Sequence, residues 1–358
     1  MDFGLSDEQR LLQDTVAKFL EKENDPTRLR ARFDAEEAFD AGFWRGVAEL
    51  GVAGLVIPET QGGAGLPLLD AALVAETLGR FAAPGPFLGH TLASLAVALG
   101  GSPEQRRHWL PRLATGDVVA SVAFAEPGGG WQPEDWRLAA GKSLSGVKEH
   151  VPFAKSADLL VVGTAGGGLA LVERERGGSV IEPFPGVDRT RRLDTVRFDG
   201  AAAEELPGGV AAAPRVRDAG LVLLAADAFG GASRLVEMTV AYASTREQFG
   251  VTIGHFQALK HQLANMALEV EPGRALYWYA AHAFDHAPED APRMAALAKA
   301  HLGDRLLGVA RDAVEAHGGL GYTWECDVQI WFKRAIFDRT FLGSSSVHRE
   351  RAAKLAGW

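Results

Sequence analysis

Residues 242–261 read Tyr-Ala-Ser-Thr-Arg-Glu-Gln-Phe-Gly-Val-Thr-Ile-Gly-His-Phe-Gln-Ala-Leu-Lys-His. This stretch joins two segments of helical periodicity. Gly250 can stop the first helix, and Arg246 lies in its last turn, where a positive charge is favourable. Taken in isolation, the five residues from Arg246 to Gly250 are typical of an ordinary capped helix end. The fold is predicted from this stretch together with the pattern of helices and strands on either side of it.

The C-terminal part of the chain shows helical periodicity in four long stretches. They run roughly over residues 216–246, 256–286, 292–318 and 328–355. Pro272 lies inside the second stretch and should kink or break it, because proline removes a helical hydrogen bond. Four long helices predict a bundle, beginning after a boundary at Ala211-Ala212-Ala213-Pro214.

The first third of the chain is predicted to be all helical. Ser6 and Gln9 have the spacing of a capping box at the start of an amphipathic helix. Further helical patterns cover residues 41–50, 68–80, 91–99 and 104–113.

Short strand-like segments then follow one another. They cover residues 118–124, 143–151, 157–162, 169–173, 179–183 and 192–198. The triple glycine at 166–168 is interpreted as a hairpin turn and not a phosphate loop, because a strand pattern follows it instead of a helix. The predicted class is α+β, with a helical domain over 1–116, an antiparallel β-domain over 117–210 and a four-helix bundle over 211–358.

Composition excludes several classes of protein. The 358 residues are 47% hydrophobic and 23% charged, with a net charge of -9, which argues against a broad nucleic-acid surface. Cys326 is the single cysteine, so there is no intrachain disulfide or thiolate metal site, and the histidines show no metal-ligand spacing. The start, Met1-Asp2-Phe3-Gly4, lacks the features of a secretory signal. The best apolar run, 219–232, is too short to span a bilayer and contains Asp227. A cytoplasmic protein without membrane insertion is expected.

Several motifs together resemble the acyl-CoA dehydrogenase family over nearly the whole chain. They are the stretch 242–261, Glu315 to Tyr322 (Glu-Ala-His-Gly-Gly-Leu-Gly-Tyr), Phe341 to Ser345, Ala123 to Gly130, and Pro58 to Gly65. The resemblance implies a helical domain, a central β-domain and a C-terminal four-helix bundle. It also implies a tetramer built from dimers, with FAD between subunits. The implied reaction is α,β-dehydrogenation of an acyl-CoA, with an electron-transfer flavoprotein as acceptor.

The same resemblance assigns cofactor contacts. Arg246 would hold the FAD pyrophosphate of a neighbouring subunit, Phe249 would lie against the cofactor, and Gln257 would lie nearby. A guanidinium suits this role because it meets phosphate oxygens in a fixed fork. The family usually has glutamine where this chain has Glu315, and a carboxylate there repels phosphate unless a cation such as Arg246 neutralises it. The cofactor-binding candidates are Arg246, Phe249, Gln257, Glu315, Gly318 and Gly319.

The flavin face of the β-domain departs from the family pattern. The family has a hydroxyl residue at Ala125 and serine at Trp131, which bond flavin and thioester. It commonly has tryptophan at His150, covering the ring, and threonine at Pro152, bonding the flavin near N5. Proline can donate no hydrogen bond.

The catalytic base is also missing. The family's glutamate falls at Leu342, and the position used by some branches falls near Gly220. The leading hypothesis is therefore a base-lacking subunit of a heteromeric (α2β2) FAD-dependent enzyme, completed by a paralogous subunit that carries the base. Such subunits occur in enzymes that act on steroid side-chain CoA esters. One alternative is a homomeric dehydrogenase with Asp227 or Asp218 as an unusual base. A second is a flavin-free assembly or binding protein on the same fold.

Overall fold

The structure is a computed structural model, and it describes residues 4–35 and 39–358. Met1-Asp2-Phe3, on which the prediction about a secretory signal depends, lies outside the described residues. The chain forms two compact units. The first comprises Met1–Val16, Arg30–Ala71 and Pro84–Gly220, and the second Ala17–Leu29, Ala72–Ala83 and Leu221–Trp358. Each unit is described by itself.

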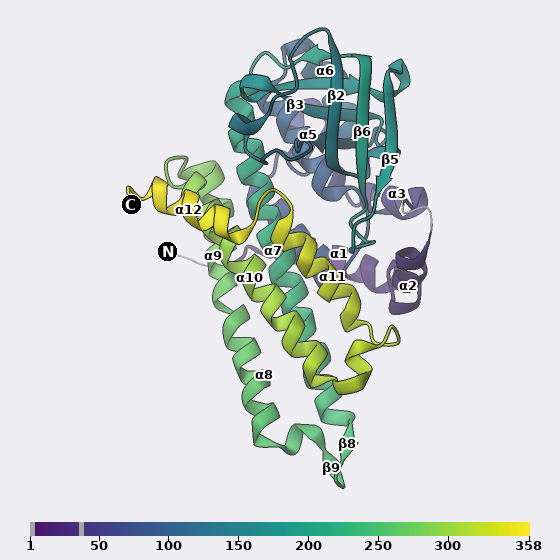
Figure 1. Ribbon diagram of the computed structural model, residues 1–358, viewed down its shortest axis with the longest axis vertical. Helices are drawn as coiled ribbons and strands as arrows, with labels where there is room; N and C mark the ends of the chain where they lie inside the picture. The colour runs from purple at the N-terminus through teal and green to yellow at the C-terminus, as the bar shows by residue number, and fades with distance from the viewer. Residues whose placement is uncertain (1–3, 36–38) are drawn as a thin grey trace. The chain divides into compact units, whose positions relative to one another are not determined.

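The N-terminal third is helical, as its periodicity predicted (Figure 1). Its helices are α1 (Asp7–Glu23), α2 (Pro26–Asp34), α3 (Ala41–Glu49), α4 (Leu68–Arg80), α5 (Phe87–Gly100) and α6 (Pro103–Ala114). The predicted capping box is present, because the Gln9 N–H donates to the Ser6 hydroxyl and the Ser6 N–H donates to the Gln9 side chain. The helix predicted over 91–99 begins earlier, at Phe87, directly after Pro86.

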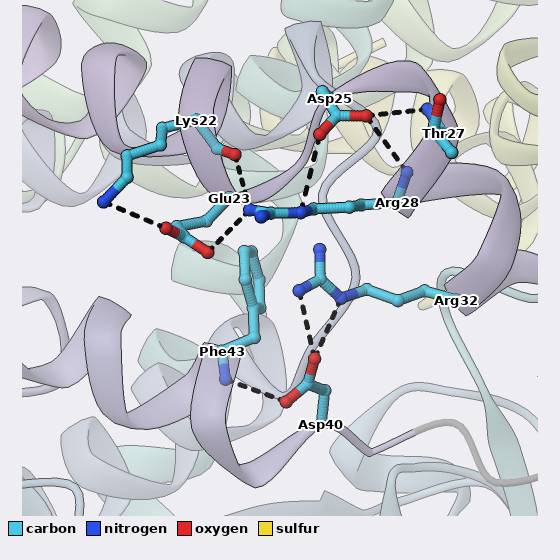
Figure 2. Close-up of polar contacts among 8 residues, drawn as sticks. All are labelled: Lys22, Glu23, Asp25, Thr27, Arg28, Arg32, Asp40 and Phe43. Carbon is cyan, nitrogen blue, oxygen red and sulfur yellow. Dashed lines mark hydrogen bonds and ion pairs between the residues drawn. The ribbon is translucent and has the colours of Figure 1, made fainter.

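Acidic side chains begin two of these helices (Figure 2). Asp25 accepts hydrogen bonds from the backbone N–H groups of Thr27 and Arg28 at the start of α2, at 2.8 and 3.2 Å. Asp40 accepts from the Phe43 N–H at 2.9 Å and so caps α3. Such caps satisfy donors that have no partner within the helix.

The β-domain holds two sheets (Figure 1). The strands are β1 (Ala120–Ala123), β2 (Ser143–Pro152), β3 (Leu159–Thr164), β4 (Gly168–Glu173), β5 (Ser179–Phe184), β6 (Leu193–Ala202) and β7 (Glu204–Glu205). They pair in the orders β1-β3-β4-β7 and β2-β6-β5. β3 and β4 form the antiparallel hairpin predicted at the triple glycine. Its turn uses left-handed backbone at Gly166 and Gly167, which glycine adopts without strain.

The prediction of a wholly antiparallel sheet was wrong at one pair of strands. β1 and β3 are parallel, with Ala120 opposite Leu159. The chain between them passes through β2 in the other sheet, and this crossover returns β3 in the direction of β1. Buried side chains, among them Leu144, Leu160 and Val196, form the core of the domain.

The C-terminal domain is helical, but two of its four predicted stretches are divided. Its helices are α7 (Gly209–Thr245), α8 (Gln257–Val270), α9 (Pro272–His286), α10 (Ala291–Ala316), α11 (Val328–Thr340) and α12 (Ser345–Leu355). Pro272 begins α9 and confirms the predicted break. The stretch predicted over 328–355 is divided between α11 and α12. Helix α11 ends at Thr340, because Leu342 and Gly343 have left-handed backbone, with φ of 60° and 109°. α10 contacts α8, α9, α11 and α12 and is the central helix of this group.

Helix α7 is longer than predicted. It begins at Gly209 and runs past Pro214, where a boundary was predicted. By length and composition α7 could cross a membrane, contrary to the expectation that no run was long enough. Since 83% of its most apolar window is buried within the protein, it has the character of a core helix. The helical, β and helical domains are confirmed, and their exact predicted boundaries stay predictions.

The remaining elements are short. They are the strands β8 (Glu247–Gln248) and β9 (Val251–Thr252) and the 3-10 helices η1 (Val52–Gly54), η2 (Glu59–Gln61), η3 (Pro133–Asp135), η4 (Ala154–Ser156), η5 (Ala165–Gly167), η6 (Arg174–Arg176), η7 (Ile253–His255) and η8 (Gly318–Tyr322).

Candidate active site

A buried ion pair in the first unit anchors the loop after β1. Lys148 on β2 is fully buried, and its Nζ lies 2.7 Å from Oε1 of Glu126. Burial lowers the pKa of Lys148 to about 8, although Glu126 acts in the opposite direction. Glu126 also accepts a hydrogen bond from the backbone N–H of Leu138 at 2.9 Å. These bonds fix the loop that carries Ala125 and Trp131.

The residues of this loop and of β2 offer few donors to a flavin. Ala125 is 3% exposed and presents only a methyl group. Pro152 is buried at the end of β2, and its carbonyl accepts the hydroxyl of Ser121. A buried proline has neither a side-chain donor nor an N–H. Ala125 and Pro152, the two positions of the β-domain discussed in the sequence analysis, therefore provide no side-chain hydrogen-bond donor.

Two aromatic side chains lie against His150. The imidazole lies 4.3 Å from the Phe184 ring and 5.7 Å from the Trp131 ring, between centroids. Burial lowers the pKa of His150, so the imidazole is neutral at pH 7. Its Nδ1 is buried and makes no hydrogen bond within the described residues. His150 also has a left-handed backbone, with φ of 56°, which is uncommon for a residue with a side chain.

In the second unit, the predicted pyrophosphate residues are exposed. Arg246 follows α7 directly, and its backbone N–H donates to the Tyr242 carbonyl. Phe249 lies between β8 and β9 in the chain and is 93% exposed. Gln257 is the first residue of α8 and is exposed. Arg246, Phe249 and Gln257 are therefore all accessible from solvent.

The ends of α7 and α10 meet next to these residues. Tyr242 stacks on His317 with ring centroids 4.4 Å apart. This contact places the segment containing Glu315, Gly318 and Gly319 at the same end of the bundle as Arg246. Glu315 is exposed, and the two glycines have open space where a Cβ would stand. The structure therefore brings the six predicted cofactor-binding residues to one end of the second unit.

Neither predicted base position carries an acid. Leu342 is 0% exposed in the turn between α11 and α12, and its carbonyl lies 2.9 Å from Nε2 of the buried His348. Gly220 is buried within α7. The turn is therefore occupied by an apolar side chain that packs inside the protein.

The two alternative bases are held by arginines. Both oxygens of Asp227 accept from Arg334, at 2.7 and 2.6 Å, and the two residues are 4% and 1% exposed. Asp218 accepts from Nε of the adjacent Arg217 at 3.0 Å. A carboxylate held by a buried guanidinium is stabilised in its ionised form and positioned by that partner, which makes Asp227 poorly suited to take a proton from a substrate.

Sequence reasoning missed the partners of these carboxylates, which are Arg334 for Asp227 and Arg217 for Asp218. It also missed Gln132, which accepts a hydrogen bond from Arg217. The signal was available for Arg217, because charged residues inside an otherwise apolar helical run need buried partners. A cavity of about 610 Å³ in the first unit, lined in part by Trp44 and Phe184, is lined by none of the predicted site residues. Within residues 4–35 and 39–358, no group of three His, Cys, Asp or Glu side chains could hold a metal ion.

The order of domains is that of a family of oxidoreductases. The N-terminal domain of acyl-CoA dehydrogenases matches residues 6–117, and the C-terminal domain matches residues 209–356. The chain belongs to the acyl-CoA dehydrogenase family.

Several relatives are similar along almost their whole length. The acyl-CoA dehydrogenase IpdE2 of Mycolicibacterium smegmatis is 35% identical over 95% of this chain and 96% of its own. The solved structure of a Tcur3481-Tcur3483 steroid ACAD variant has a TM-score of 0.90 at 32% identity and covers 98% of both chains. The ChsE4-ChsE5 complex from Mycobacterium tuberculosis has a TM-score of 0.89 at 26% identity and covers 100% of this chain and 99% of that one.

Proposed function

We propose that this chain is a base-lacking subunit of a heteromeric, FAD-dependent acyl-CoA dehydrogenase. The observation that carries the proposal is Leu342, an apolar and fully buried side chain where the family places its glutamate. General acid–base groups contribute about 10²–10⁴-fold to catalysis. A chain without this group at Leu342 or Gly220 needs a partner that supplies it.

The two halves of the chain differ in how well they fit FAD. The exposed Arg246, Phe249 and open glycines fit a pyrophosphate and ring offered by a neighbouring subunit, since guanidinium and backbone can approach phosphate closely there. The β-domain face does not fit a flavin, because Ala125 and Pro152 supply no donor. When bound, FAD supplies the acceptor for the hydride that leaves the substrate's β-carbon.

Similar proteins support a two-component assembly. One similar structure is described as a ChsE4-ChsE5 complex and another as a Tcur3481-Tcur3483 steroid ACAD. We therefore include a paralogous subunit as partner, a steroid side-chain CoA ester as the substrate class and an electron-transfer flavoprotein as acceptor. The complex is proposed to be cytoplasmic.

The proposal is tested by producing the chain alone and together with paralogous dehydrogenase subunits. FAD per polypeptide is measured by absorbance, and dehydrogenation is measured with an artificial electron acceptor. The chain alone should show no turnover, and the correct pair should be yellow and active. Stoichiometric FAD with turnover in the isolated chain contradicts the proposal.

Arg246 offers a sharper version of this test. Arg246→Leu in the complex should lower FAD content, and Arg246→Lys should restore part of it, because a lysine keeps the charge without the fork. Arg107→Leu, at an exposed position on α6, is the matched control and should leave FAD content unchanged. Equal FAD content in Arg246→Leu and the control would show that this residue does not hold the cofactor.

A flavin-free assembly protein is the second candidate, and the β-domain face without donors favours it. A complex that is active with FAD bound only at the partner's sites, and unaffected by Arg246→Leu, would support this candidate.

A further inference from the structure

A cavity in the first unit is formed by segments that are far apart in the sequence. It measures about 610 Å³, which lies within the range of small-molecule sites. Helix α3 contributes one face, at positions 41, 44, 45 and 48, which have the spacing of neighbours on a helix. The turn after α6, the segment after β2, the end of β5 and the start of β6 supply most of the rest. The cavity is therefore separate from the predicted cofactor-binding residues, none of which lines it.

Aromatic side chains make part of the wall rigid. Trp44 and Phe153 line the cavity and are 5% and 2% exposed, so neighbouring residues hold them in place. Phe184 is half-buried, and its ring lies 4.3 Å from the imidazole of His150, between centroids. Phe153 also has a left-handed backbone, with φ of 48°, a costly conformation that is often found at ligand sites. A flat apolar group can bury its surface against this preformed wall.

The charges of the lining are unequal. It holds four cations and three acids, and the acids are Asp117, Asp158 and Asp194. Each acid accepts a hydrogen bond from within the chain, at 2.8 to 3.0 Å. Asp158 also lies 3.7 Å from the guanidinium of Arg174. The acids are therefore already engaged by the protein, and the lining as a whole is positive.

Arg192 is a cation of this lining that lacks a carboxylate partner. Its Nε donates to the carbonyl of Arg189 at 3.1 Å, and its Nη2 donates to the carbonyl of Ala35 at 2.5 Å. Over residues 4–35 and 39–358, no carboxylate forms an ion pair with it. Burial lowers the pKa of Arg192, and Arg189 acts in the same direction, while Asp188 and Asp194 act in the opposite one. A guanidinium that is fixed by neutral carbonyls and has further N–H donors favours an anion from outside the chain.

We propose that this cavity binds a small aromatic carboxylate. The carboxylate accepts charge-assisted hydrogen bonds from Arg192, and the ring lies against Phe153 and Phe184. Arg45 is exposed on α3, makes no hydrogen bond or ion pair with a described residue, and adds attraction for the anion. A phosphate monoester fits less well, because it brings about −1.5 to −2 charge close to the three lining acids. The inference involves neither FAD nor acyl-CoA and goes beyond the proposed function.

The test measures dissociation constants by titration calorimetry with the full chain. The probes are 2-naphthoate, 2-naphthamide, which has the same ring without the charge, and acetate, which has the charge without the ring. The dissociation constant of 2-naphthoate should be about 1 mM or lower. The other two probes should bind at least about tenfold more weakly, because each lacks one of the two recognised groups.

Substitutions then locate the site. Arg192→Met should weaken binding of 2-naphthoate by about 10- to 100-fold and that of 2-naphthamide by less than about threefold. Arg192→Lys should recover part of the loss, because a lysine keeps the charge without the fork. The matched control is Arg197→Met, which removes an exposed arginine of β6 outside the cavity and should change binding less than about twofold.

A second variant covers the case in which Arg192→Met does not fold, since Arg192 also bonds two carbonyls of the chain. Arg45→Glu changes an exposed residue and reverses a charge of the lining. It should weaken 2-naphthoate by about threefold or more and leave 2-naphthamide unchanged. Circular dichroism shows which variants are folded.

The inference is overturned by a dissociation constant of 2-naphthoate above about 10 mM, or by equal affinities for 2-naphthoate and 2-naphthamide. Unchanged affinity in the folded arginine variants of the cavity has the same consequence. An equal loss in Arg197→Met would show only a general attraction of the protein surface for anions and also overturns it. FAD content and turnover, which decide the proposed function, are measured separately and do not enter these outcomes.

Discussion

The buried pair between Asp227 and Arg334 offers a direct test of how the second unit is held together. The side chains are 4% and 1% exposed, and two charge-assisted hydrogen bonds join them. Arg334 also donates to the carbonyl of Ala83 at 3.0 Å, so one guanidinium ties α7 and α11 to the chain after α4. We expect each single replacement, Asp227→Leu or Arg334→Met, to be strongly destabilising.

The magnitude follows from which charge is left behind. Removing one member of a buried pair costs about 3–5 kcal/mol, because the remaining charge has lost its compensation. Arg334→Met also leaves the Ala83 carbonyl without this donor, which adds about 1 kcal/mol. The double variant removes both charges and inserts apolar volume, and such exchanges are often neutral or stabilising. The double variant should therefore be more stable than either single variant.

Urea unfolding followed by circular dichroism measures the three differences in the free energy of unfolding. They form a double-mutant cycle, and a double variant more stable than either single variant requires a coupling energy above the larger single cost, which is about 4–6 kcal/mol. Additive effects of the two replacements, or single variants within about 1 kcal/mol of the original chain, would refute the reasoning. A folded, stable Asp227→Leu chain that loses the activity of its complex would instead make Asp227 a catalytic group.

Two further predictions concern packing and pH. Gly230→Ala should destabilise the chain by at least about 1–3 kcal/mol, because the new Cβ would lie 1.9 Å from the Glu76 carbonyl oxygen. The control is Gly231→Ala, whose Cβ would meet no atom nearer than 3.4 Å and which should be tolerated. Thermal unfolding measures both. Equal melting temperatures would contradict the close approach of α4 and α7. Burial lowers the pKa of His90 to about 4. Since an unfolded histidine takes up its proton near 6.5, the free energy of unfolding should fall as pH drops from about 6.5 to 4, and His90→Gln should make this fall less steep. Identical pH profiles for the two chains in urea titrations would exclude His90 as the source.

Local patterns predicted the elements well where neighbouring residues determine them. The helix over 68–80 has the predicted bounds, and Pro272 divides α8 from α9 because proline acts on its own turn. The turn at Leu342 was not predicted, since leucine rarely adopts a left-handed backbone. Its carbonyl contact with His348, six residues further on, helps to fix it.

Contacts between distant segments were beyond the reach of periodicity. The parallel pairing of β1 with β3 depends on how the intervening chain crosses to the other sheet. Likewise, Lys148 carries no local sign that Glu126 will neutralise it 22 residues away. The predicted cofactor residues do gather at one end of the second unit, but the polar partners Gln132 and Arg217 became visible only through their hydrogen bond.

The groups that are absent at Ala125, Pro152 and Leu342 and the exposed side chains of Arg246 and Phe249 have one explanation under the proposed function. The donors missing at Ala125 and Pro152 lie in the first unit, and the missing carboxylate at Leu342 lies in the second, 217 and 190 residues further along the chain. The proposed function accounts for both departures, since a subunit whose own site takes no part in catalysis requires neither the donors nor the carboxylate. Arg246 and Phe249, by contrast, are both exposed, and burying the Phe249 ring, which is 93% exposed, against a neighbour would be favourable. A surface that is costly alone and suited to a neighbour's pyrophosphate is what a subunit needs when it acts for a partner's site.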